Sequence, residues 1–283
     1  MDISVIVPCY NGERYVRACL EALLAQSYPR DRYEVILVDN GSTDRTAELA
    51  RRFPVTVVEA PKRGSYAARN AGIRAASGGI LAFTDSDCEV SPTWLERVAA
   101  SLAEPGVVAV LGARRFARET LVLTTIADYE IEKARYVFSR NDASVYYAYT
   151  NNMAVRREVY ERAGPFVEMA RGADVVFMSR IVEAYGCDAV RFAPGLVVRH
   201  LEIDRWYSWH RKMFIYGRSY ANYRRLSHTR PLRYSSRVEI LRRTAEVHGY
   251  GFVRTNCLLA FGVMATLAFG VGKAIGGRAA APK

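Results

Sequence analysis

Two aspartates, Asp85 and Asp87, are spaced by a single residue and directly follow the apolar run 79–83. If that run is a strand, both carboxylates lie at its end, at the edge of a sheet. Carboxylate oxygens in this arrangement suit Mg²⁺ or Mn²⁺, and such cations commonly keep phosphate oxygens of a substrate in their shell. The pattern alone is weak, because Asp-x-Asp also occurs in solvated turns and helix caps. The surrounding elements have to decide between these interpretations.

The first 90 residues alternate strand and helix patterns. Apolar runs at 3–7, 35–38, 55–58 and 80–84 predict strands, and helical spacings at 16–24, 47–50 and 66–76 separate them. Near-continuous apolar strands that alternate with helices are typical of a parallel sheet covered on both faces. Ligands bind beyond the carboxyl ends of such strands. We therefore expect residues 8–11, Asp39 and the two aspartates at 85 and 87 to converge on one crevice.

The rest of the pattern is less regular but continues the mixture of helices and strands. Helices are predicted at 92–102, 121–138, 156–163 and 172–185, and strands at 107–111, 145–149 and 196–199. With 283 residues, 50% of them hydrophobic, the chain can bury one large core, or one core and a small appendage. Its five cysteines show no paired spacing, which favours a reducing cytosolic setting over a disulfide framework or a zinc site. No charged-then-apolar leader opens the sequence, so no secretory signal is predicted.

The net charge of +11 is concentrated in the C-terminal third. Residues 199–254 hold 13 Lys and Arg against 4 Asp and Glu, whereas residues 1–198 hold 24 against 25. An enzyme that acts on nucleic acid more often carries its basic charge around its motifs. No nucleic-acid partner is therefore predicted.

Two C-terminal segments point to a membrane. A helix around 206–225 carries one stripe of large residues at alternating spacings of three and four: Trp206, Trp209, Met213, Tyr216, Tyr220 and Tyr223. With basic residues on its other faces, this helix is typical of a membrane surface, and equally of packing against the rest of the domain. Cys257–Gly272 is a run of 16 uncharged residues, short of the roughly 20 that span a bilayer. It predicts a marginal span, an interfacial segment or an oligomer contact, and membrane attachment is favoured because basic charge and the apolar run coincide.

Four segments resemble the successive motifs of family 2 glycosyltransferases: SVIVPCYN at 4–11, VDNGSTD at 38–44, ARNAG at 68–72 and FTDSD at 83–87. The resemblance covers about residues 1–225. It implies an inverting enzyme with a GT-A fold, a mostly parallel sheet flanked by helices, that uses a nucleotide sugar. Residues 1–112 would form the nucleotide-sugar half and 113–204 the acceptor half. Residues 205–283 would form a basic and hydrophobic C-terminal region that attaches to a membrane.

The resemblance also implies roles for individual residues. Asp87, Asp85 and His200 would hold Mg²⁺ or Mn²⁺, which acts as a Lewis acid on the diphosphate leaving group. The contacts to the nucleotide sugar are assigned to Pro8, Tyr10, Asp39, Arg69 and Asp85. A turn cap at Asp39 and plain surface roles for Arg69 and His200 are the alternatives. Ser42 and Asp44 are expected to cap the local turn.

Inversion requires a general base that deprotonates the acceptor hydroxyl. The family places this base in a Glu-Asp pair at the start of a helix, and Asp174 matches the aspartate; the alternative is a helix cap. Ala173 stands where the family has glutamate, which puts an acceptor contact in doubt but not the base. Asn152 resembles an acceptor-side hydrogen-bonding residue, with a purely structural turn as the alternative.

The sequence thus predicts a metal-dependent inverting glycosyltransferase at the cytoplasmic side of the cell membrane. A UDP-sugar is the favoured donor, and a glycan or lipid-linked molecule is the acceptor. One alternative is a nucleotidyltransferase, which would require a Gly-rich basic loop after the first strand. Another is a non-catalytic sugar- or lipid-binding protein on the same scaffold. A nicotinamide dehydrogenase is disfavoured, since no G-x-G-x-x-G follows the first strand.

Overall fold

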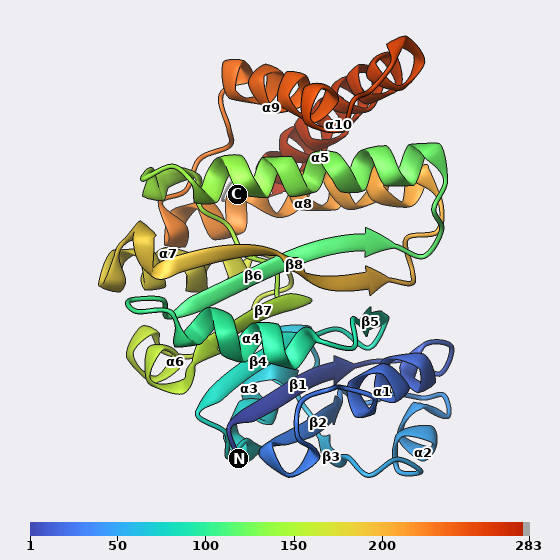
Figure 1. Cartoon of the computed structure of the whole chain (residues 1–283), viewed down its shortest axis with the longest axis vertical. Helices are drawn as coiled ribbons and strands as arrows, with labels where there is room; N and C mark the ends of the chain where they lie inside the picture. Colours follow the sequence, from blue (N-terminus) through green and yellow to red (C-terminus); the bar gives the residue numbers. More distant parts are fainter. Residues whose placement is uncertain (280–283) are drawn as a thin grey trace.

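The computed structural model describes residues 1–279, with side chains to residue 276. Within these residues eight strands form one sheet, in the order β3-β2-β1-β4-β7-β6-β8-β5 (Figure 1). The strands are β1 Ile3–Cys9, β2 Tyr33–Asp39, β3 Thr56–Glu59, β4 Ile80–Thr84, β5 Cys88–Val90, β6 Ala109–Phe116, β7 Asn152–Arg156 and β8 Val190–His200.

Helices surround this sheet and extend beyond it at the C-terminal side (Figure 1). They are α1 Val16–Leu24, α2 Thr46–Ala50, α3 Ser65–Ala75, α4 Trp94–Ala103, α5 Leu121–Phe138, α6 Arg157–Ala163, α7 Ala173–Tyr185, α8 Trp206–Ser227, α9 Tyr234–Val247 and α10 Phe252–Ala279. Single 3₁₀ turns are η1 Arg30–Arg32, η2 Ala143–Val145 and η3 Cys187–Ala189.

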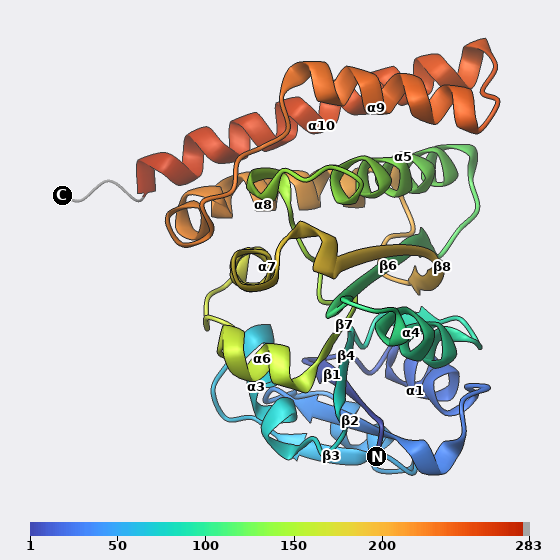
Figure 2. The same cartoon turned by 60° about the vertical axis from the view of Figure 1, so that its left-hand side comes forward.

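The first four strands form the predicted parallel sheet. β1 pairs in parallel with β2 and β4, and β2 pairs in parallel with β3. Successive residues of β1 point to opposite faces, with Val5 and Val7 in the core under α1 and α4 and Ile6 in the core under α3 and α7. Because apolar surface is buried on both faces, every residue of β1 is apolar or paired, and the strand is fully buried. Figure 2 shows α1 and α4 on one side of these strands and α3 and α6 on the other.

The predicted strand at 145–149 is wrong. Its residues form the turn η2 and an irregular segment, and the strand begins later, as β7, which runs antiparallel between β4 and β6. Tyrosine side chains, and not backbone pairing with a neighbouring strand, hold this segment in place. The Tyr149 hydroxyl donates to the Gly112 carbonyl at 2.6 Å, and the Tyr146 hydroxyl donates to the Arg140 carbonyl at 3.2 Å. The short strand β5, antiparallel to β8, was not predicted.

α8 packs against the body of the protein, and its stripe of large residues faces inward. Trp209 and Tyr220 are buried, and Met213 packs in a small core with Phe116 of β6 and Leu123 of α5. Of the stripe, only Trp206 has a large exposed fraction, 47%. The stripe is therefore a packing surface and not a membrane-facing one.

α10 extends the apolar run that the sequence marks at 257–272. Its segment Phe252–Gly276 has 25 residues, enough by length and composition alone to cross a membrane, and little of it is buried. One side of α10 packs closely against α8, where Gly272 of α10 faces the Phe214 carbonyl and Gly217 of α8 faces the Phe269 carbonyl. α5 and α8 form a layer between the sheet and the pair α9–α10 (Figures 1 and 2).

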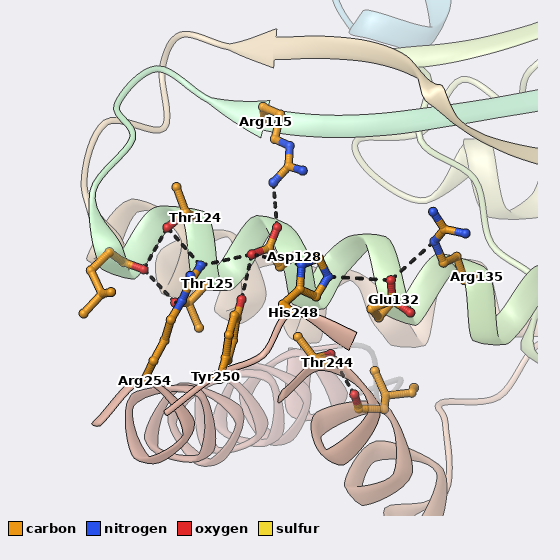
Figure 3. Close-up of polar contacts among 12 residues, drawn as sticks. Arg115, Thr124, Thr125, Asp128, Glu132, Arg135, Thr244, His248, Tyr250 and Arg254 are labelled. Carbon is orange, nitrogen blue, oxygen red and sulfur yellow. Dashed lines mark hydrogen bonds and ion pairs between the residues drawn. The ribbon is translucent and has the colours of Figure 1, made fainter. Parts of the chain in front are cut away.

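Charged contacts hold this pair of helices to α5 (Figure 3). The Asp128 carboxylate of α5 accepts from Arg115 at 2.7 Å, from the Tyr250 hydroxyl at 2.7 Å and from Arg254 at 3.0 Å. Asp128 is 7% exposed and its cationic partners outnumber it. These contacts connect β6, α5 and the start of α10. The C-terminal helices are therefore packed against α5 and the sheet domain.

Candidate active site

A cavity of about 650 Å³ lies where the carboxyl ends of β1 and β4 meet α3, α7 and α8. Its walls include most of the residues singled out by the sequence: Pro8, Tyr10, Arg69, Asp85, Asp87, Asp174 and His200. Asp39 and Asn152 are not among its lining residues. Remote segments thus converge on one crevice, as the strand ends predict.

The acidic end of the cavity is built by the loop after β4 and the end of β8. β5 pairs with β8 so that Cys88 lies opposite His200. This pairing brings Oδ2 of Asp87 to 3.5 Å from Nδ1 of His200. Burial, and then the neighbouring Asp85 carboxylate, raise the pKa of Asp87 to about 7. A carboxylate held in this way favours a cation that would stabilise its charged form.

His200 and Asp87 have the chemistry of a metal site. His200 is buried, and within the described residues its Nδ1 has no hydrogen-bond partner. Burial and the charges of Lys212 and Arg114 hold the pKa of His200 well below its usual value, so the imidazole is neutral and able to donate a lone pair. Cys88 also lies within reach, but burial raises the pKa of its thiol well above the usual value. The protonated thiol is a poor ligand, which leaves oxygen and imidazole donors of the kind that Mg²⁺ or Mn²⁺ accepts.

Arg69 of α3 is 3% exposed and forms an ion pair with Asp85. Its guanidinium also donates to the Ser65 carbonyl at 3.2 Å. Arg69 is therefore an inward-facing cation at the cavity wall, and the alternative of a plain surface arginine is wrong. The charge of Asp85 is thus compensated by the Arg69 guanidinium. Asp87 has no comparable arginine partner among the described residues.

The open end of the cavity is formed by the turn after β1. Tyr10 is 49% exposed, and the Arg63 guanidinium lies 4.6 Å from its ring centroid. Asp39 ends β2 beside Cys9, and its Oδ1 accepts from the Ser42 amide at 3.3 Å, as expected of a turn cap. Asp44 caps the next turn as predicted, accepting from the Thr46 amide at 3.0 Å.

Asp174 lies in the first turn of α7, two residues after Gly172. Gly172 has φ +92°, and a Cβ there would collide with Tyr223 of α8, so only glycine permits this entry into the helix. Asp174 accepts from the Val175 amide at 3.0 Å but does not occupy the cap position, which is Gly172. Burial raises the pKa of Asp174, opposed by its hydrogen bond with Tyr66 and the charge of Arg69.

Asn152 does not face the cavity. It is completely buried: its Oδ1 accepts from the Trp94 indole at 2.8 Å, and its Nδ2 donates to the carbonyls of Ala113 at 2.8 Å and Leu196 at 2.9 Å. This side chain holds β6, β8 and α4 together, which is the structural alternative. The preceding residue, Asn151, lines the cavity with a buried Oδ1 that has no partner among the described residues.

Ala173 is also completely buried and belongs to the main core. A glutamate at this position would bring a carboxylate into apolar surroundings. The departure from the family pattern thus fits the packing at the start of α7.

The sequence interpretation missed several residues of the cavity. Arg114, Glu130 and Lys133 line it, as do large residues of α8 such as Tyr216 and Tyr223. For α8, the stripe of large residues in the sequence already indicated which side of the helix faces the protein. The charged residues of α5 gave none, because charges on a helix usually mark its solvent face.

Comparisons with known proteins agree with this architecture. The family model described as Glycosyl transferase family 2 matches residues 4–164. Glycosyltransferase AglE of Haloferax volcanii is 38% identical over 192 residues, 64% of this chain and 62% of AglE. Poly(ribitol-phosphate) beta-N-acetylglucosaminyltransferase TarS of Staphylococcus aureus is 34% identical over 110 residues, 37% of this chain and 19% of TarS. The chain spans less than two thirds of the length of these relatives.

Solved structures show the same fold. Mannosyltransferase PcManGT from Pyrobaculum calidifontis, in complex with GDP-Man and Mn²⁺, matches with a TM-score of 0.66 at 22% identity, over 96% of this chain and 86% of that chain. S. aureus TarS 1-349, in complex with UDP-GlcNAc, matches with a TM-score of 0.55 at 19% identity, over 88% and 72%. Since the family match covers more than half of the sequence, the chain belongs to glycosyltransferase family 2, and its fold is α/β.

Proposed function

We propose that this glycosyltransferase moves a sugar from a nucleotide sugar to a hydroxyl of a glycan or glycolipid acceptor, by direct displacement with inversion. One observation carries the proposal: the acidic site at Asp85 and Asp87 and the candidate base Asp174 line the same cavity. One enclosed space can therefore hold the diphosphate leaving group and the attacking hydroxyl together, which is the main requirement of a displacement reaction.

The nucleotide sugar is assigned to the end formed by Pro8, Tyr10 and Arg69. An exposed tyrosine ring offers a flat apolar surface for a base, and a buried guanidinium offers charge to a phosphate. Asp39, at the end of the neighbouring strand, is assigned to the ribose or base. The nucleotide sugars bound by PcManGT and TarS support a donor of this class, and we propose a UDP-sugar.

Asp87 and His200 would hold Mg²⁺ or Mn²⁺, with the Asp85 carboxylate beside them. When bound, the cation neutralises the negative charge that develops on the diphosphate. His200 would then carry its proton on Nε2. Lys212, whose Nζ lies 2.8 Å from that atom in the structure, would then turn away from it to the Glu202 carboxylate, 3.2 Å away, because an ammonium and an N–H cannot donate to each other. The Mn²⁺ in the PcManGT complex supports a divalent cation.

Asp174 would take the proton from the acceptor hydroxyl. Its raised pKa makes the carboxylate a stronger base. Asn151 replaces Asn152 as the proposed acceptor contact, because its side-chain oxygen at the cavity wall has no hydrogen-bond partner in the part of the chain that the structure describes.

We also propose that the enzyme works at the cytoplasmic surface of a membrane. The exposed side of α10 carries an apolar stripe, comprising Leu259, Val263, Leu267, Val271 and Ile275. The opposite side is packed on α8. A helix with one side covered by protein and the other apolar fits an interfacial position better than a free span.

The test is turnover of a panel of UDP-, GDP- and dTDP-sugars by the full chain, with and without Mn²⁺ or Mg²⁺. Hydrolysis of the donor in the absence of acceptor serves as the first readout. The variants are Asp87→Ala and Asp174→Asn, with Asp188→Asn as a matched control at an exposed aspartate outside the cavity.

We expect a metal-stimulated reaction with one nucleotide class, lost in Asp87→Ala, lowered roughly 10²–10⁴-fold in transfer by Asp174→Asn, and unchanged in the control. The proposal fails if the wild type binds sugars but turns none over, which favours a non-catalytic binding protein. It also fails if the product is a nucleotidyl transfer product.

A further inference from the structure

A second group of charged residues lines the same cavity and is not used by the proposed reaction. Arg114 of β6, Lys133 of α5 and Arg237 of α9 form what we call the basic cluster, with Glu130 of α5 among them. Glu130 pairs through Oε1 with Lys133 at 2.6 Å and through Oε2 with Arg114 at 2.9 Å. Its two oxygens are thus both engaged by neighbouring cations.

Arg237 leaves the basic cluster with excess positive charge. Its guanidinium donates to the Thr266 hydroxyl at 3.0 Å, and no carboxylate lies within ion-pair distance of it in the described part of the chain. Three cations therefore face one carboxylate, which leaves two positive charges at the wall of the cavity. The side chains of Arg114 and Lys133 are only 21% and 20% exposed, so bulk solvent screens their charge poorly, whereas the Arg237 contact lies nearer the surface.

The surroundings of the basic cluster are those of a ligand site. The Arg114 guanidinium lies 4.1 Å from the ring centroid of Tyr149, and Lys133 Nζ lies 5.4 Å from that of Tyr147. The Tyr147 hydroxyl is buried and has no hydrogen-bond partner among the described residues. Burial lowers the pKa of Lys133 even though Glu130 opposes the shift. An anion beside these groups would accept from the free hydroxyl and balance the uncompensated charge.

The same cavity has an apolar wall next to Arg237. Ala265 and Phe269 of α10 line it together with Leu232. Ala265 and Phe269 lie on the helix whose opposite side carries the exposed apolar stripe. A ligand at the basic cluster therefore meets a cationic group and an apolar surface together.

We propose that the basic cluster binds a phosphate group of the acceptor, and that an apolar chain attached to this phosphate lies against α10. This inference rests on the proposed function, because it names the acceptor of that reaction as a phosphate-bearing lipid. A neutral glycan would leave the two positive charges and the Tyr147 hydroxyl unpaired in a partly dehydrated site, which is costly.

The experiment measures binding to the full chain by isothermal titration with three soluble probes: n-octyl phosphate, n-octanol and inorganic phosphate. The test variants are Arg237→Gln and Lys133→Gln. Arg242→Gln is the matched control, because Arg242 lies on the same helix, pairs with Glu246 at the surface and does not line the cavity. Binding of UDP and GDP with Mn²⁺ is measured in parallel on every variant.

We expect octyl phosphate to bind more tightly than octanol or inorganic phosphate, and Arg237→Gln to weaken it roughly tenfold or more. Lys133→Gln should weaken it as well, the control should not, and nucleotide binding should remain. Equal affinity in wild type and Arg237→Gln would overturn the phosphate site. If inorganic phosphate binds as tightly as octyl phosphate, the phosphate site stands and the lipid assignment is overturned. If the wild type binds octyl phosphate but binds neither UDP nor GDP, the proposed nucleotide-sugar donor is refuted instead.

Discussion

At the scale of single residues, Asp174 is expected to trade stability for reactivity. Burial raises its pKa above that of the unfolded chain, so its favourable contribution to folding is complete below the unfolded pKa near 4 and is lost as the pH rises through the folded pKa. As the pH rises, ionising the buried carboxylate therefore costs folding free energy. Asp174→Asn should raise the Tm at pH 7 by about 2–4 °C, equivalent to ~1 kcal/mol, while it lowers transfer roughly 10²–10⁴-fold. Thermal unfolding at pH 7 and pH 4 measures this; a lower Tm for the variant at pH 7, or a gain as large at pH 4, contradicts it.

Much of the site could be predicted because it lies at strand ends. Asp85, Asp87 and His200 each follow an apolar run, and parallel strand ends meet at one edge of a sheet. Asn152 could not be placed in this way, since neighbouring residues of a strand point to opposite sides and the sequence does not show which of Asn151 and Asn152 points inward. The basic cluster was missed for a related reason. Lys133 lies on α5 and Arg237 on α9, and the inward direction of these side chains depends on what packs against those helices.

At the scale of elements, the contact between α8 and α10 depends on glycine. A Cβ at Gly272 would collide with the Phe214 carbonyl, a backbone atom that cannot swing away, whereas a Cβ at Gly270 of the same helix meets nothing within 4 Å. Gly272→Ala should therefore destabilise the protein by about 1–3 kcal/mol through overpacking. Gly270→Ala should stabilise it by up to about 1 kcal/mol through helix propensity. Chemical unfolding of both variants compares them directly, and equal effects would show that α10 does not pack on α8 in solution.

The helices and strands that could be predicted are those whose sequence pattern lies within the element itself. The strands β1–β4 and the helices α3, α5 and α7 follow from runs and spacings within 4–18 residues. β5 has only 3 residues and exists because β8 pairs with it. The segment 145–149 has strand-like composition, but its tyrosines bond to distant carbonyls and line a cavity. Tertiary contacts decided both cases, and single-sequence patterns do not contain them.

At the scale of the whole molecule, charge and apolar surface are segregated along the long axis. The strands β1–β3, from the near-neutral residues 1–198, lie at one end, and α9 and α10, from the basic C-terminal third, lie at the other (Figure 2). The exposed α10 stripe belongs to this basic end of the molecule, a combination that suits an anionic membrane, and the same helix lines the cavity on its inner side. A protein docked by this face would have its acceptor site next to the lipid.

This arrangement predicts interfacial binding, which vesicle flotation can measure. The full chain should float with vesicles that contain anionic lipid and should be released by alkaline carbonate, because α10 keeps its contact with α8 instead of crossing the bilayer. Val263→Gln combined with Leu267→Gln should lower the bound fraction at least roughly tenfold, since each buried apolar side chain contributes about 1.5–3 kcal/mol. Leu267→Ile, which keeps the apolar surface, should float as the wild type does. Retention after carbonate would indicate that α10 spans the bilayer, and flotation of the double glutamine variant would show that the membrane contacts another face.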